Sequence, residues 1–227
     1  MGKVIKRTKT GKVREAERMK TGYDELSDKV HKGNIKKYKN IFRLALGYKK
    51  NVKYKMIKDY AEQETQKDIR KDMIEKIDSI ISINGKKYNI QEHIRSIQAA
   101  IYNDIAITFD HNDGYNAEYK TSKADLLLYV VCDGKANSEK IIKMPEKNIK
   151  ISVVDLQKTL RLIKTGKIKK PKEKLNRTTG QTFLVISIRQ LYENGCLLFH
   201  WQNKDFLPKQ LIVNQKIYFD QAKEEVS

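Results

Sequence analysis

The chain has 227 residues, enough to bury a substantial core, and its 47 Lys and Arg against 28 Asp and Glu give a net charge of +19. Such an excess argues against an ordinary metabolic enzyme and indicates a polyanionic partner. No run approaches the roughly 18 apolar residues of a membrane span, and the basic start is not followed by an apolar segment, so we expect no membrane contact and no secretion. The two cysteines, Cys132 and Cys196, form no disulfide framework. We therefore expect a protein of the cytoplasm or of a virus particle.

The charge is concentrated in two blocks. Residues 1–60 hold 19 basic and 6 acidic side chains, and within them residues 34–58 hold nine basic groups and no acidic one. The second block, residues 161–177, has eight basic groups against Glu173 alone. Dense blocks of this kind favour contact with a polyanion, although solvated surface is the alternative interpretation. Lys outnumbers Arg by 38 to 9, which favours attraction to a phosphate backbone over reading of base edges, or reflects genome composition.

The pattern predicts an α+β protein with a basic arm over residues 1–22, a mostly helical region over 23–103 and a mixed, β-rich domain over 104–227. In the helical region, Ile35, Tyr38 and Phe42 have helical spacing and Gly47 is a plausible stop. A longer helix is predicted over about 54–79, with Ile69, Met73, Ile77 and Ile80 as its apolar stripe, and another near 91–102, with Ile94, Ile97 and Ile101. Between them, Asn84-Gly85 between alternating apolar residues predicts a hairpin with a type I′ turn.

The C-terminal half reads mainly as strands. Strands are predicted over 105–109, 125–131, 182–188, 196–201 and 210–219, with a turn at Asn194-Gly195. A helix over about 153–165 is expected to open at Ser152, which has capping-box spacing to Asp155, and to end at Gly166. Its inward stripe is Leu156, Leu160 and Ile163, and its other face is basic and continues into the basic loop that follows.

One short motif points to catalysis. Glu118-Tyr119-Lys120 is an acidic-x-Lys triplet that follows Asp104, and it resembles the PD-(D/E)xK nuclease family over about residues 104–120. The resemblance implies a divalent metal, Mg²⁺, held by Asp104 and Glu118, with Lys120 stabilising developing charge. If residues 111–114 form a hairpin turn, however, Asp104 faces away from Glu118 and Lys120, because side chains alternate along strands. We therefore favour a surface hairpin, with the nuclease as an alternative.

Other arrangements with possible chemistry are weaker. Asp125 stands at the start of a predicted strand, but the later strand offers Lys150 without an acidic-x-Lys triplet. Cys196 and His200 are four residues apart on a predicted strand, and no second pair completes a structural zinc site. We predict no metal site and no cofactor, apart from Mg²⁺ if the nuclease alternative holds.

The sequence thus favours a non-catalytic, nucleic-acid-associated protein that contacts phosphates. The alternatives are a structural subunit of a large assembly, such as a virus particle or ribonucleoprotein with neighbouring subunits as partners, and the nuclease. Tyrosines interleaved with lysines in the first block fit base stacking, although Tyr38 and Phe42 also fit a core stripe. The predicted nucleic-acid-binding residues are Lys3, Lys6, Arg7, Lys36, Lys37, Lys49, Lys50, Lys158, Arg161, Lys164, Lys167, Lys169, Lys170 and Lys172.

Overall fold

The structure is a computed structural model of the chain. It describes residues 2–7, 13–18, 21–48, 54–59, 75–110, 118–137, 139–169, 172–175 and 182–203.

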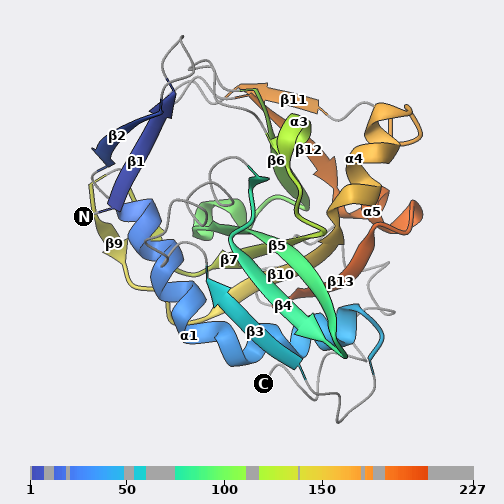
Figure 1. Ribbon diagram of the computed structural model, residues 1–227, viewed down its shortest axis with the longest axis horizontal. Coiled ribbons are helices and arrows are strands. Elements are labelled where there is room, and N and C mark those ends of the chain that lie inside the picture. Colours follow the sequence, from blue (N-terminus) through green and yellow to red (C-terminus); the bar gives the residue numbers. More distant parts are fainter. Residues whose placement is uncertain are drawn as a thin grey trace.

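A six-stranded sheet forms the centre of the molecule (Figure 1). Its strands lie in the order β13-β10-β7-β5-β4-β3, and all neighbours are antiparallel except the parallel pair β5 and β7. Their bounds are β3 Tyr54–Asp59, β4 Ser79–Ile83, β5 Lys86–Arg95, β7 Leu126–Cys132, β10 Asn148–Asp155 and β13 Leu197–Gln202. Every residue of β7 is buried, as expected for a strand covered on both faces. The sheet takes strands from both sides of the expected boundary between residues 103 and 104.

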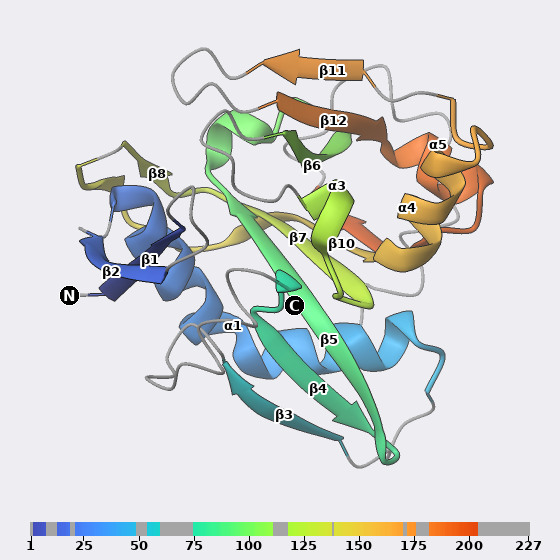
Figure 2. The ribbon, with the colours of Figure 1, turned by 45° about the horizontal axis from the view of Figure 1, so that its top comes forward.

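The helix α1, Gly22–Ala45, covers one face of this sheet (Figure 2). Tyr38 and Phe42 are fully buried there against apolar side chains of the central strands, so their core interpretation is confirmed. The helix begins at Gly22, well before Ile35, the first residue of the predicted apolar stripe. It ends as predicted near Gly47, whose φ of 72° is left-handed and which closes the last turn through its N–H to Leu44 O at 3.0 Å.

The opposite face is covered by a second, three-stranded antiparallel sheet and by short helices. The order of this sheet is β11-β12-β6, and β6 packs beside the helix α3 (Figure 2). The elements are β6 Asp104–Asp110, β11 Lys172–Leu175, β12 Thr182–Ser187, α3 Glu118–Thr121, α4 Leu156–Lys164, α5 Ile188–Glu193 and a 3-10 helix at Ile97–Ala99.

Two small hairpins complete the fold. In the N-terminal arm, β1 (Gly2–Arg7) pairs with β2 (Val13–Arg18), and near the start of α1, β8 (Lys135–Ala136) pairs with β9 (Ile141–Lys143). Across residues 2–203 as far as the structure describes them, no helix is both long and apolar enough to cross a membrane.

The predicted hairpin at Asn84-Gly85 is confirmed. Ile83 and Lys86 pair directly across the turn, and Asn84 and Gly85 have φ values of 51° and 78°. Positive φ at both central residues is the signature of a type I′ turn, which suits the right-handed twist of the flanking strands.

The prediction of a mostly helical N-terminal half is not borne out by the described residues, although the α+β class holds. Residues 54–59 and 79 belong to strands rather than to a helix over 54–79, while Ile69 and Met73 lie outside the described residues. The predicted helix near 91–102 is instead the second half of β5 and the 3-10 turn, and Ile101 is 70% exposed. The apolar spacing of this segment fits both helix and strand, and its pairing with β7 stabilises the strand.

The C-terminal predictions are largely confirmed. The strands near 105–109, 125–131, 182–188 and 196–201 are present, and the predicted strand over 210–219 lies outside the described residues. The helix near 153–165 is also present as α4, but its cap is Asp155 and not Ser152, which lies within β10. Strand pairing of β10 with β7 and β13 runs through Ser152, so the chain leaves the sheet only at Asp155.

Candidate nucleic-acid interface

The helix α4 presents a basic face to solvent because its apolar residues point into the core. The Asp155 carboxylate caps the helix by accepting the Lys158 N–H at 2.9 Å. Leu156 and Leu160 are buried, which turns Arg161 and Lys164 outward.

The same charge continues through the loop after α4 and into β11. We call this the α4 basic surface; it comprises Lys158, Arg161, Lys164, Lys167, Lys169 and Lys174. All of these are exposed except Lys158, which is half-buried and donates from Nζ to Gly195 O at 2.8 Å. Of the other predicted residues, Lys170 lies outside the described residues and Lys172 is the first residue of β11. The predicted cations of α4 and of the loop after it therefore follow one another along the surface; they are Lys158, Arg161, Lys164, Lys167 and Lys169.

Two lysines of the α4 basic surface lie over tyrosine rings. Lys164 Nζ is 5.6 Å from the ring centroid of Tyr119, and Lys174 Nζ is 4.8 Å from that of Tyr102. Tyr102 is 48% exposed. Cation–π contacts of this kind hold the ammonium groups near aromatic rings, and the exposed ring of Tyr102 can also meet a flat ligand such as a base.

The predicted basic residues of α1 lie on the other side of the six-stranded sheet. Lys36 is exposed, whereas Lys37 lies over the Trp201 ring, 5.8 Å from its centroid, and burial lowers its pKa. Lys49 and Lys50 lie outside the described residues. The structure therefore does not join the described basic residues of α1 to the α4 basic surface, because the sheet separates α1 from α4 (Figure 2).

The N-terminal arm is a hairpin rather than a single extended segment. Lys3, Lys6 and Arg7 lie on β1, where they pair across the ladder with Glu17, Arg14 and Val13.

The residues of the acidic-x-Lys triplet lie in the helix α3, so the predicted hairpin over 104–120 is wrong. The strand β6, which starts at Asp104, pairs with β12 instead. The predicted turn at 111–114 lies outside the described residues. Burial raises the pKa of Asp104, opposed by the cations Lys174 and Lys150. Glu118 and Lys120 thus do not occupy the strand on which the PD-(D/E)xK resemblance requires them.

A row of buried polar side chains crosses the sheet on the α4 side. His200, Ser152, Tyr129 and His93 are direct neighbours on β13, β10, β7 and β5, and all are buried. Ser152 Oγ and His200 Nδ1 are 2.9 Å apart, and His93 Nδ1 is 3.1 Å from the backbone oxygen of Ala106. Burial, with the nearby charge of Lys150, lowers the pKa of His200 to about 3, so this imidazole is neutral at physiological pH.

Lys150 ties this row to the second sheet. Its side chain is fully buried, and Nζ donates to the backbone oxygens of Tyr102 at 2.8 Å and Asp104 at 3.2 Å. Burial lowers the pKa of Lys150 to about 8, opposed by the carboxylate of Asp104. The sequence places Lys150 on a predicted strand but carries no local signal of this role, because its partners lie about 46 residues earlier in the chain.

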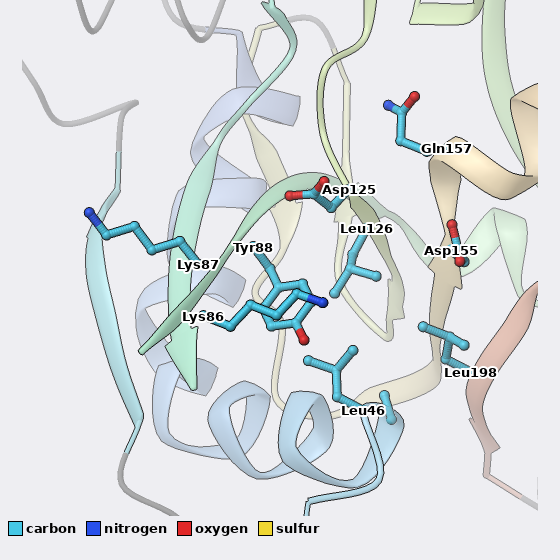
Figure 3. A pocket seen from close by; sticks show the side chains of 10 residues that line it. Leu46, Lys86, Lys87, Tyr88, Asp125, Leu126, Asp155, Gln157 and Leu198 are labelled. Atoms are coloured by element: carbon cyan, nitrogen blue, oxygen red, sulfur yellow. The ribbon is translucent and has the colours of Figure 1, made fainter. Parts of the chain in front are cut away.

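A pocket of about 430 Å³ opens near the N-terminus of α4 (Figure 3). Its walls come from the end of α1, the start of β5, the start of β7, the junction of β10 with α4, and β13. The lining residues are Ala45, Leu46, Lys86, Lys87, Tyr88, Asp125, Leu126, Asp155, Gln157 and Leu198. Of these, the sequence singles out Asp125 as an acidic residue at a strand start and Asp155 as part of a capping box.

No protein-family model, curated protein or solved structure matches this chain. Its function must therefore be inferred from its own geometry and charge.

Proposed function

We propose that this protein binds nucleic acid without catalysis and contacts the phosphate backbone through the α4 basic surface and the N-terminal arm. The observation that carries the proposal is the run of exposed cations, Arg161, Lys164, Lys167, Lys169 and Lys174, beside exposed tyrosine. Among the described residues none of these cations forms an ion pair. Unpaired exposed ammonium and guanidinium groups can neutralise phosphates and release their counterions, which is the main source of sequence-independent affinity.

The test compares charge reversal on the two sides of the sheet. One variant carries Lys164→Glu, Lys167→Glu and Lys169→Glu, and the matched control carries Lys29→Glu, Lys32→Glu and Lys36→Glu on exposed positions of α1. Binding to labelled duplex and single-stranded DNA and RNA is measured between 50 and 200 mM salt, with and without Mg²⁺. Because each lost phosphate contact lowers the salt slope by about 0.9 on duplex DNA, we expect the first variant to lose roughly 2–3 units of slope and the control to keep the native slope.

Other outcomes would overturn the proposal. Equal loss in both variants would mean that only net charge matters. Absence of binding by the native protein would favour the assembly subunit, in which the same surface contacts an acidic neighbour. Cleavage that requires Mg²⁺ would favour the nuclease alternative.

A further inference from the structure

The pocket beside α4 is distinct in chemistry from the α4 basic surface. Its volume of about 430 Å³ lies within the range of about 300–1,000 Å³ that is usual for small-ligand sites. One wall is apolar and is formed by Leu46, Leu126 and Leu198, which come from three different elements. Such a wall accepts a flat, poorly hydrated group.

A cationic side chain extends across the opening of the pocket. Lys86 crosses the ring of Tyr88, with Nζ 4.9 Å from the ring centroid (Figure 3). This is its sole charged or aromatic contact with the described residues, and Lys86 and the adjacent Lys87 are both exposed. A cation–π contact leaves the N–H groups of the ammonium available, so an anionic group on a ligand can pair with Lys86.

Tyr88 is held in place as a neutral phenol. Its hydroxyl is 3.3 Å from that of Tyr48, and burial together with this hydrogen bond raises the pKa of Tyr88 to about 12. The ring therefore provides a fixed, uncharged surface next to Lys86.

The opposite side of the pocket offers rigid hydrogen-bond acceptors. Asp125 Oδ2 accepts the backbone N–H of Asn89 at 2.8 Å, which fixes the carboxylate and leaves Oδ1 without a donor among the described residues. Gln157 donates from Nε2 to the backbone oxygens of Ser122 and Ala124 at 3.1 and 2.7 Å, so its remaining polar atom is the acceptor Oε1. Hydroxyl or amino groups of a ligand can therefore donate hydrogen bonds to Asp125 Oδ1 and Gln157 Oε1.

We propose that this pocket binds a nucleotide. The apolar wall would receive the base, the Asp125 and Gln157 oxygens would accept ribose hydroxyls or an exocyclic amine, and Lys86 would pair with the phosphate, whereas Lys87 points away from the pocket (Figure 3). Such a nucleotide could be free or could belong to a bound strand, and in the second case the inference rests on the proposed nucleic-acid binding.

The first experiment measures binding of adenosine, cytidine, guanosine and uridine 5′-monophosphates and of the matching nucleosides to the full chain by calorimetry. Lys86→Ala should weaken the nucleotides about tenfold or more, because it removes a charge-assisted bond, and should leave the nucleosides unchanged. Lys140→Ala, a change at an exposed lysine outside the pocket, should alter neither. Absence of binding by all four nucleotides at millimolar concentration would overturn the inference, as would an equal loss for nucleotide and nucleoside.

A second variant, Leu198→Trp, places a bulkier side chain at a half-buried position of the wall and should abolish binding of nucleotides and nucleosides alike. If it also weakens binding of a short single strand, the nucleotide belongs to the strand; if strand binding is unchanged, the pocket takes a free nucleotide. The reversal of Lys164, Lys167 and Lys169 should leave mononucleotide affinity unchanged. Failure of the pocket and failure of the α4 basic surface are therefore separable.

Discussion

The two faces of the six-stranded sheet use opposite means of stabilisation. The α1 face, as far as the structure describes it, is an apolar layer with a buried imidazole–carboxylate pair, in which His31 Nδ1 lies 2.6 Å from Glu92 Oε2 and Ser79 donates to the other carboxylate oxygen at 2.7 Å. The α4 face carries the polar row and the single ammonium of Lys150, held by backbone carbonyls. The buried polar side chains of the α1 face are therefore matched by one another, whereas on the α4 face the buried ammonium of Lys150 has backbone oxygens as its partners. The α4 basic surface and part of the pocket wall belong to the α4 side.

The largest effect is expected from breaking the His31–Glu92 pair on the α1 face. His31→Ala leaves the Glu92 carboxylate, whose side chain is 7% exposed, without the imidazole that lies 2.6 Å away. At a pH where His31 is protonated, the change removes one partner of a buried ion pair, which costs about 3–5 kcal/mol, so the free energy of unfolding in urea should fall by that amount. Adding Glu92→Gln to the same chain should recover much of the loss. A loss below about 1 kcal/mol would mean that the pair is not effectively buried.

On the α4 face the sharpest test is the pH dependence of Lys150→Met. The pKa of Lys150 is about 8 in the folded chain and 10.5 in the unfolded chain, so between these values the unfolded state binds more protons and native stability rises with pH. The difference in unfolding free energy between native protein and variant should therefore shift by about 3 kcal/mol in favour of the native protein from pH 8 to 10.5.

The charged and titratable groups that face Lys150 are Asp104, His200 and Tyr129. They are present in both proteins, so the comparison isolates the lysine. Urea unfolding at pH 7, 8, 9 and 10 measures the difference, and a constant difference across this range would contradict the prediction.

A smaller effect is expected where α1 approaches the β8–β9 hairpin. A Cβ at Gly22 would overlap the backbone of Lys140 and the backbone oxygen of Asn137. Gly22→Ala should therefore destabilise the protein by about 1–3 kcal/mol, since backbone atoms cannot move aside cheaply. Gly33→Ala is the control in the same helix, where a Cβ meets nothing within 4 Å, and it should stabilise by roughly 0.5–1 kcal/mol. Thermal unfolding of the two variants tests the sign of both stability changes. Equal changes in stability would show that Gly22 lies farther from the backbone of Lys140 and Asn137 than the structure places it.

Local signals in the sequence predicted the parts of the fold that depend on neighbouring residues. The turn at Asn84-Gly85, the strand β7 and the helix α4 follow from turn chemistry, β-branched residues and apolar periodicity. The second half of β5 was not predictable in this way, because Ile90 and Ile94 fit either period and the strand is settled by a partner more than thirty residues later.

In the candidate site, too, the features that depend on neighbouring residues were predictable from the sequence, and those that depend on distant residues were not. The α4 basic surface lies within one continuous segment and was visible as a charge run. The separation of this surface from the α1 lysines required knowledge of which face each helix covers. The pocket combines five elements, and no single segment carries more than three of its residues, so no local pattern could reveal it.

The pairing of β6 with β12 has a consequence for the order in which the chain acquires its structure. Asp104 pairs with Ser187, so β6 must wait until some eighty further residues have left the ribosome before its ladder can form. Contacts of such long sequence separation form late and slowly. The β4–β5 hairpin can form as soon as it emerges, but the layer that anchors Lys150 and frames the α4 basic surface can close only after β12 has emerged. The six-stranded sheet waits longer still, for β13, so both layers are completed by strands that follow α4 in the chain.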